Sequence, residues 1–151
     1  MSEMAVSDFQ RSDQDAVRAL ILSGLGEHWG EIDESLNPDL ADITASYAGG
    51  RTIVVRLQDS IVATGTITRR DAMTAEILRM SVASGHRRMG LGRLVVDELI
   101  TTARQWGVRA VVLETSARWR EVIAFYASCG FALTHLADGP FGQDQWFRCE
   151  L

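Results

Sequence analysis

A short stretch in the second half of the chain combines residue types that bind anions. The segment GHRRMGLGR, from Gly85 to Arg93, holds three arginines, one histidine and three glycines, in a chain whose net charge is −5. It follows a strand-like segment and opens a helical pattern, so its glycines let the backbone approach a ligand at a helix N-terminus. Unpaired N–H groups there favour an anion, and arginine suits phosphate geometry. The segment predicts a phosphate or pyrophosphate site, with a tight turn of solvated arginines as the alternative.

Two familiar phosphate loops do not fit this segment. A Walker loop requires Gly-Lys-Ser/Thr, whereas Gly92 is followed by Arg93 and Leu94. A dinucleotide-binding fingerprint requires a third glycine, and Val95 stands at that position. The predicted anion site therefore belongs to neither of these two classes.

Other reactive side chains are spread along the chain. His28, His86 and His135 lack the paired spacing of metal ligands, so we expect no metal site. Cys129 and Cys149 form no C-x-x-C pair, and Cys129 lies in an apolar helical pattern that predicts a buried free thiol. No Ser-His-Asp arrangement with a nucleophile elbow occurs, so a hydrolase of that type is not expected.

The elements that must position the glycine-rich segment follow from hydrophobic periodicity and from turn residues. The pattern predicts the order β-α-α-β-β-β-α-β-α-β-β, which is α/β with a mixed sheet rather than a clean Rossmann alternation. The expected strands cover residues 4–9, 52–57, 61–68, 75–82, 108–115, 131–135 and 145–151, and the expected helices cover 11–30, 36–50, 90–107 and 116–130. No linker or repeat divides residues 1–151, so we expect a single domain.

Composition and sequence patterns argue against nucleic-acid binding, membrane spans and a signal peptide. A sequence pI near 5.1 argues against a protein that binds nucleic-acid backbone. No apolar run approaches the roughly 18 residues of a membrane span. The N-terminal segment MSEMAVSDFQ has no basic region followed by an apolar core, so no signal peptide is expected. Together these features predict a cytoplasmic protein.

The glycine-rich segment and its surroundings resemble one known family. The run Arg87 to Gly92, RRMGLG, is similar to the Arg/Gln-x-x-Gly-x-Gly/Ala loop of the GCN5-related N-acetyltransferase (GNAT) superfamily. The preceding AEILRMSV resembles that family's fourth strand, and VVLETSARWREVIAFYASCGF resembles its next strand and helix, with Tyr126 ahead of Gly130 and Phe131. The resemblance covers about residues 75–131. It implies a twisted, mostly antiparallel sheet flanked by helices, with splayed fourth and fifth strands.

The resemblance also implies a cofactor, acetyl-CoA. The family's loop amides wrap the pyrophosphate of coenzyme A, and here the matching residues are Arg87, Arg88, Met89, Gly90, Leu91, Gly92 and Arg93. The pantetheine arm would pair with the strand edge at Met80, Ser81 and Val82. By the same resemblance, the Met80 amide would face the thioester carbonyl and stabilise the developing oxyanion.

Two side chains fall where the family carries its acid and base. Tyr126 matches the general-acid tyrosine, which would protonate the departing thiolate. The alternative is a tyrosine that only packs on its helix. Glu76 matches a catalytic glutamate of some members and would take the amine proton directly or through water. Its alternative is a carboxylate that binds solvent or the substrate's ammonium group.

One position departs from the family pattern. Many members carry an asparagine seven residues before the tyrosine, and Trp119 stands there in this chain. Trp119 would stack on the cofactor or wall the acceptor site, or it is simply a partly exposed aromatic residue in the first helical turn.

The acceptor site of this fold is implied to lie between the first two helices, their connecting loop and the C-terminal strands. His28, Trp29, Glu31 and Tyr47 are the candidates there, and nearby carboxylates and an aromatic ring suit a cationic amine. A solvated acidic loop is the alternative. A small amine, an amino-acid derivative and a protein lysine or N-terminus all remain open as acceptors.

The expected activity is direct transfer of an acetyl group from acetyl-CoA to an amine in a ternary complex. A non-catalytic acyl-CoA-binding or sensor module is the main alternative, and a nucleotide-binding domain is a third class. The oligomeric state stays open, with a homodimer among the possibilities.

Overall fold

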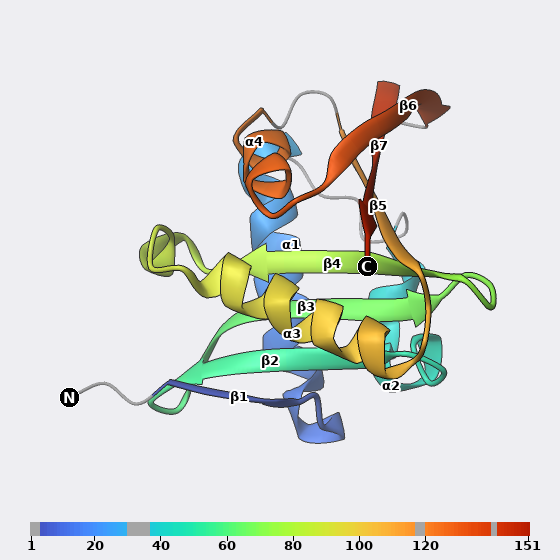
Figure 1. Ribbon diagram of the computed structural model, residues 1–151. Helices are drawn as coiled ribbons and strands as arrows, with labels where there is room; N and C mark the ends of the chain where they lie inside the picture. Colours follow the sequence, from blue (N-terminus) through green and yellow to red (C-terminus); the bar gives the residue numbers. More distant parts are fainter. Residues whose placement is uncertain (1–3, 30–36, 117–119, 140–141) are drawn as a thin grey trace.

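The computed structural model describes residues 4–29, 37–116, 120–139 and 142–151. Its centre is a seven-stranded sheet in the order β1-β2-β3-β4-β5-β7-β6 (Figure 1). The strands are β1 Met4–Asp8, β2 Arg51–Leu57, β3 Ser60–Arg69, β4 Thr74–Val82, β5 Ala110–Ser116, β6 Ala132–Gly139 and β7 Gly142–Glu150. All neighbours pair antiparallel except β4 and β5, which are parallel. The predicted mixed, mostly antiparallel sheet is confirmed.

Strands β4 and β5 separate soon after they begin. Their parallel register covers three pairs, which end at Glu76 opposite Val112. From there β4 continues to Val82 along β3, and β5 continues to Ser116 along β7. Figure 1 shows the two strands starting together and then diverging. The expected splay is therefore present, and the edge of β4 beyond Glu76 has no partner in β5.

Helices cover both faces of the sheet. Helix α1 Gln14–Trp29 and the single turn α2 Ile43–Ser46 pack on one face, called here the α1 face, together with the buried Val54 of β2. Helices α3 Leu91–Gln105 and α4 Arg120–Ser128 pack on the opposite α3 face. Figure 1 shows α3 in front of the sheet and α1 behind it. Within the described residues, no helix is long and apolar enough to cross a membrane.

The second predicted helix, over residues 36–50, is broken into two short pieces. A 3-10 turn, η3 Pro38–Ala41, precedes α2, and Asp42 between them has an extended backbone with φ −149°. The Asp42 carboxylate accepts a hydrogen bond from the Ala45 amide at 3.1 Å and so caps α2. Asp42 therefore acts as a helix N-cap in the middle of the predicted helix, which forces a new start.

Core packing follows the predicted periodicity. Helix α3 buries Leu91, Val95, Leu99 and Ala103 against the sheet, at the 3.6-residue spacing of one helical face. Cys129 is a free thiol, as predicted, but it is only partly buried, at the position just after α4 ends at Ser128.

Candidate functional site

The glycine-rich segment forms a loop between the end of β4 and the start of α3. After a 3-10 turn, η4 Ser84–His86, both Arg88 and Gly90 adopt left-handed backbone conformations, with φ of 66° and 79°. Gly90 is the N-cap of α3 and supplies no side-chain hydrogen bond to its first turn. The N–H groups that serine or aspartate would normally satisfy therefore remain available for an anion at the positive end of the helix.

Gly92 allows α3 and α4 to approach closely at this end. A Cβ at Gly92 would lie 3.1 Å from the Phe125 ring of α4. The neighbouring Arg93 donates to the carbonyl and hydroxyl oxygens of Ser128 at 3.2 Å and 3.0 Å. These contacts join the start of α3 to the last turn of α4, and so hold the Tyr126 helix beside the loop.

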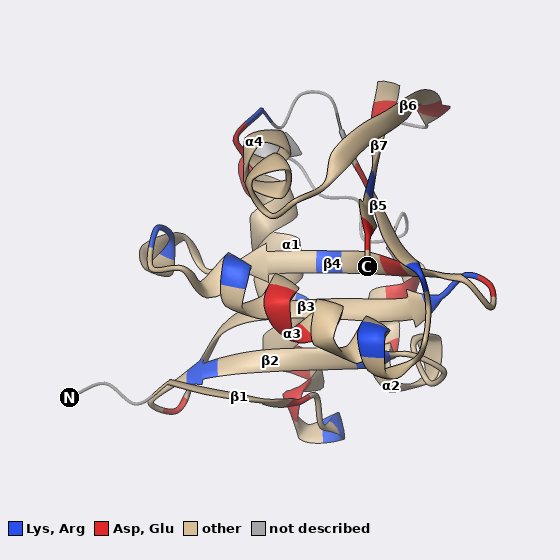
Figure 2. Ribbon diagram, viewed as in Figure 1, with Lys and Arg blue, Asp and Glu red and all other residues tan. Residues whose placement is uncertain are grey.

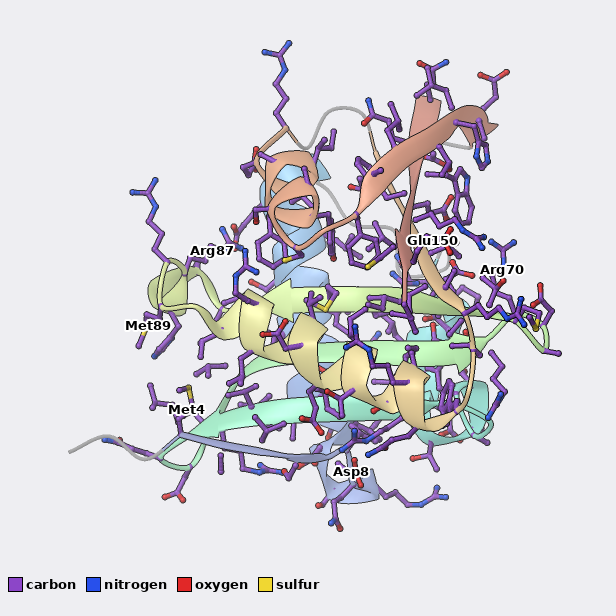
Figure 3. All side chains as sticks on the ribbon, in the orientation of Figure 1. Met4, Asp8, Arg70, Arg87, Met89 and Glu150 are labelled. Carbon is purple, nitrogen blue, oxygen red and sulfur yellow. The ribbon has the colours of Figure 1, made fainter. Side chains whose placement is uncertain are left out.

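The three arginines of the loop have different surroundings. Arg87 forms a 2.6 Å ion pair with Glu27 of α1, and Arg93 is bound to Ser128. Arg88 is exposed and has no ion pair or side-chain hydrogen bond within the described part of the chain. Figure 3 shows Arg87 and Met89 on this loop, at the opposite end of β4 from Arg70. Two of the arginines therefore brace the loop, and the side chain of Arg88 is the one left for a ligand.

Strand β4 contains a bulge beside the β4–β5 opening. Leu78 pairs with Thr66 and Ser81 pairs with Thr64, so two β4 residues, Arg79 and Met80, stand opposite the single Gly65 of β3. Arg79 has a left-handed backbone with φ 55°. A Cβ at Gly65 would lie 2.6 Å from the Met80 sulfur, so the glycine makes room for Met80.

The bulge decides which side chains of β4 reach which face. Ala75 and Ile77 point into the core of the α3 face, and strict alternation would send Arg79 there too. The extra residue turns Arg79 toward the α1 face and brings Met80 and Val82, which alternation would place on that face, into the α3-side core. Both apolar side chains therefore pack in the core of the α3 face.

Arg79 meets a carboxylate and a phenol on the α1 face. Its guanidinium binds Asp39 of η3 through two contacts, Nε to Oδ2 at 2.9 Å and Nη2 to Oδ1 at 2.6 Å. The Tyr47 hydroxyl also donates to Asp39. Burial would raise the pKa of Asp39, but hydrogen bonds from Arg79 and Tyr47 outweigh it and lower this pKa. Burial and the bond to Asp39 raise the pKa of Tyr47 to about 12.

Sequence reasoning missed Asp39 and Arg79 as members of the site. The only signal was an arginine within the apolar strand AEILRMSV, where a charge needs a partner. That partner lies 40 residues away in the sequence. Tyr47, a candidate for binding the acceptor, donates its hydroxyl to Asp39.

Glu76 lies where β4 and β5 part. It pairs with Thr68 of β3 and Val112 of β5. Thr68 lies on the same face of β3 as Thr64, and Thr64 pairs with Val54, which is buried on the α1 face. Glu76 is therefore on the α1 face. Glu76 and Arg79 are the charged residues of β4, and Figure 2 shows charged segments in red and blue on this strand.

The surroundings of Glu76 shift its acidity. Its side chain is 15% exposed, and the Arg70 guanidinium lies 3.7 Å away. Burial raises the pKa of Glu76, and Arg70 offsets only part of this rise. Burial also raises the pKa of Glu114, helped by the carboxylates of Asp144 and Glu76. A carboxylate with a raised pKa is better matched to proton transfer near neutrality.

Tyr126 lies on α4 with its side chain in the core of the α3 face. It is 6% exposed and makes edge contacts with the Phe125 and Phe131 rings at centroid distances of 5.2 Å and 5.9 Å. Burial raises the pKa of Tyr126, so the phenol is protonated at neutral pH. Tyr126 and Glu76 therefore lie on opposite faces of the sheet.

The remaining predicted site residues are placed as follows. Ser81 donates its hydroxyl to the Leu20 carbonyl of α1 at 3.3 Å. His28 and Trp29 belong to the last turn of α1, but their side chains lie outside the described part of the structure. Glu31 and Trp119 also lie outside the described residues.

A cavity of about 510 Å³ lies between the β3–β4 hairpin and the C-terminal strands, on the side of Glu76 remote from the glycine-rich loop. Arg70, His135, Trp146 and Arg148 are among its lining residues. The Arg70 guanidinium lies 5.0 Å from the centre of the Trp146 ring, and His135 stacks on that ring at 5.9 Å. Arg70 thus connects the cavity wall to Glu76.

Comparison with known proteins agrees with this architecture. An acetyltransferase of the GNAT family from Staphylococcus aureus Mu50 superposes with a TM-score of 0.88 at 23% identity, over 99% of each chain. A GNAT family acetyltransferase from Elizabethkingia anophelis, solved with acetyl-CoA bound, superposes with a TM-score of 0.75 at 14% identity, over 98% of each chain. At these identities the likeness shows a shared fold.

Sequence comparison identifies the family. N-acetyltransferase 8F1 of Rattus norvegicus is 32% identical over 117 residues, which cover 72% of this chain and 53% of that protein. The chain thus spans about half the length of the curated relatives it matches. The family model described as acetyltransferase (GNAT) family matches residues 15–131. With this match over most of its length and with the splayed sheet of that fold, the chain belongs to the GNAT acetyltransferase family.

Proposed function

We propose that this protein is an acetyl-CoA-dependent N-acetyltransferase that transfers the acetyl group directly to a primary amine. The observation that carries the proposal is the separation of β4 and β5 after Glu76, next to a loop that leads into the uncapped N-terminus of α3. An open strand edge suits the amide-bearing pantetheine arm, and free N–H groups suit a pyrophosphate. The solved relative with acetyl-CoA and the curated N-acetyltransferases support the same conclusion.

The loop residues Arg87 to Arg93 would hold the pyrophosphate mainly through backbone N–H groups. Gly90 and Arg88 provide the left-handed turns, and the exposed Arg88 side chain adds positive charge. The pantetheine arm would lie along the backbone of Met80, Ser81 and Val82. Since coenzyme A supplies the activated acetyl group as a thioester, the chain's own residues need only orient it and move protons.

Transfer then requires a proton acceptor, an oxyanion donor and a proton donor. Glu76, directly or through water, takes the proton of the attacking amine, whose nitrogen forms a bond to the carbonyl carbon. The Met80 amide stabilises the resulting oxyanion. When the carbon–sulfur bond breaks, Tyr126 protonates the leaving thiolate, and the products are the acetylated amine and coenzyme A.

The acceptor approaches from the α1 face in this proposal. There the negative charges of Asp144 and Glu76 raise the pKa of Glu114. This group of carboxylates would attract the ammonium form of an amine. Glu76 then removes the proton that prevents nucleophilic attack. The acceptor class is a small amine, an amino-acid derivative or a protein lysine or N-terminus.

Calorimetric titration with acetyl-CoA followed by an amine panel with thiol detection tests the proposal. Binding of acetyl-CoA and release of coenzyme A that depends on an amine are the expected results. Binding without turnover on any amine would instead indicate an acyl-CoA-binding module. Competition between ATP or NAD and coenzyme A would indicate a nucleotide-binding domain.

A further inference from the structure

We propose that Asp39 and Tyr47 are positioning residues that hold Arg79 and thereby aim the Met80 amide into the β4–β5 opening. These three side chains, Asp39, Tyr47 and Arg79, are called here the bulge clamp. The inference rests on the proposed function, because it assigns the clamp to the same reaction. Within the described part of the chain, no hydrogen bond or ion pair joins Asp39, Tyr47 or Arg79 to the loop, to Glu76 or to Tyr126.

The backbone of Arg79 needs support to keep its conformation. A left-handed φ of 55° places the Arg79 Cβ close to the following carbonyl oxygen, which is unfavourable for every residue except glycine. Such a conformation persists only where surrounding contacts determine it. Glycine would adopt it without this cost, so the presence of arginine indicates that the side chain is needed here.

The clamp supplies that support from a separate part of the fold. The two contacts between Arg79 and Asp39 are parallel and fix the plane of the guanidinium. Both side chains are 23% exposed, so water screens the pair less than a surface ion pair. The Tyr47 hydroxyl binds the same carboxylate and limits its rotation. Residues of η3 and of the end of α2 are thus bonded to the middle of β4.

The clamp acts on the next peptide bond. The Met80 N–H belongs to the planar peptide unit between Arg79 and Met80. Rotation about the Arg79 ψ angle turns this whole unit, so the backbone of Arg79 sets the direction of the Met80 N–H. An oxyanion donor must lie about 2.7–3.1 Å from the oxygen it stabilises, so a modest rotation of this unit removes the contact. By holding Arg79, the clamp fixes that rotation before any substrate binds.

A second ion pair in the fold provides a matched control. Arg56 of β2 binds Asp13 of the 3-10 turn η1 Arg11–Asp13 at 2.6 Å, so it also joins a 3-10 turn to a sheet strand. Asp13 is more buried than Asp39, with 6% side-chain exposure. Strand β2 is separated from β4 by β3. Loss of this pair therefore weakens the fold without touching the bulge.

The experiment compares Asp39→Asn, Tyr47→Phe and Asp13→Asn with the unmodified chain. The readouts are kcat and KM for acetyl-CoA, the affinity for coenzyme A by calorimetry, and the Met80 amide signal in ¹H–¹⁵N spectra. For Asp39→Asn we expect kcat to fall by about 10- to 100-fold, as for a misaligned catalytic group. Coenzyme A affinity should stay within about threefold, since the loop contacts persist. The Met80 signal should shift.

The control variants separate positioning from general stability. Tyr47→Phe should lower kcat less than Asp39→Asn, and Asp13→Asn should leave both kcat and the Met80 signal unchanged. If Asp39→Asn fails to fold, Arg79→Gly serves instead, because glycine tolerates the positive φ while the clamp is lost. That variant should fold normally and show the same loss of kcat.

The outcomes distinguish this inference from the proposed function. Unchanged kcat and an unmoved Met80 signal in Asp39→Asn would overturn the inference, and so would equal losses in Asp13→Asn. If the unmodified chain acetylates no amine, the proposed function fails, while the Met80 signal still decides whether the clamp controls this amide.

Discussion

Burial acts on the two proposed proton-transfer groups in ways that suit their roles. It raises the pKa of Tyr126 in the α3-side core, so the phenol carries its proton whenever a thiolate forms. It raises the pKa of Glu76 on the α1 face, which makes the carboxylate a stronger base. Burial therefore keeps the Tyr126 phenol protonated and makes the Glu76 carboxylate more basic.

The general-acid assignment predicts the behaviour of Tyr126→Phe. Loss of the hydroxyl should lower kcat by about 100-fold, within the range for a general acid. The phenylalanine ring keeps the contacts with Phe125 and Phe131, so stability and coenzyme A affinity should change little. Steady-state kinetics with calorimetry measure both quantities. Equal turnover in the variant would remove the assignment.

The base assignment predicts a dependence on pH. Glu76 acts only when ionised, so kcat/KM should fall as pH drops through a pKa that lies above the ordinary value of 4.5. Arg70 lowers this pKa, so Arg70→Gln should move the acid limb to still higher pH. Glu76→Gln should abolish the limb and lower activity. A pH profile that is the same in all three proteins would contradict the assignment.

At the scale of elements, the loop between β4 and α3 shows why two glycines differ in role. Gly90 has a left-handed backbone and open space around its Cα, so its conformation is what requires glycine. Gly92 lies against the Phe125 ring, so a side chain at this position would crowd α4. The same motif thus serves the proposed anion site and the packing of two helices.

Gly90→Val should remove coenzyme A binding while leaving the fold intact. A β-branched residue is strongly disfavoured at φ 79°, so the turn must change and the first amides of α3 must move. Gly85→Ala is the control within the same loop, because nothing lies within 4 Å of its added Cβ. Calorimetry measures affinity, and circular dichroism checks the fold. Normal affinity in Gly90→Val would disprove the pyrophosphate assignment.

Across the whole molecule, the sheet separates two chemical environments. The α3 face carries the larger apolar core and Tyr126, whereas the α1 face carries Glu76 and the bulge clamp. Beyond Glu76, β4 and β5 are no longer paired, and the sheet is open between them. A cofactor held at the loop end of this opening and an acceptor on the α1 face would meet there, each entering from its own side.

Overall stability depends on the α3-side core. Leu99 is fully buried in the middle of α3, so Leu99→Ala should lower the free energy of unfolding by about 2–5 kcal/mol. Leu133 on β6 is 53% exposed, and Leu133→Ala should change stability by less than about 0.5 kcal/mol. Urea unfolding of both variants tests this. Similar losses in the two would contradict the assigned core.

The sequence alone determined the order of elements, the loop and the family, because each rests on local signals. Periodicity along residues 91–106 predicts α3, and the segment RRMGLG predicts the turn that precedes it. The resemblance to the family's motifs made Tyr126, just ahead of Gly130 and Phe131, and Glu76, ahead of the loop, the candidate acid and base. These features depend on neighbours in the chain, so no long-range contact is needed to find them.

The tertiary structure alone decided how these parts meet. Asp42 breaks a predicted helix, and this places Asp39 within reach of Arg79, 40 residues away. The left-handed backbone of Arg79 has no signature in the sequence. The β4–β5 pairing ends at Glu76, and from there β5 continues along β7, a strand more than 25 residues later in the chain. Contacts between distant segments set these features, and a local pattern does not encode them.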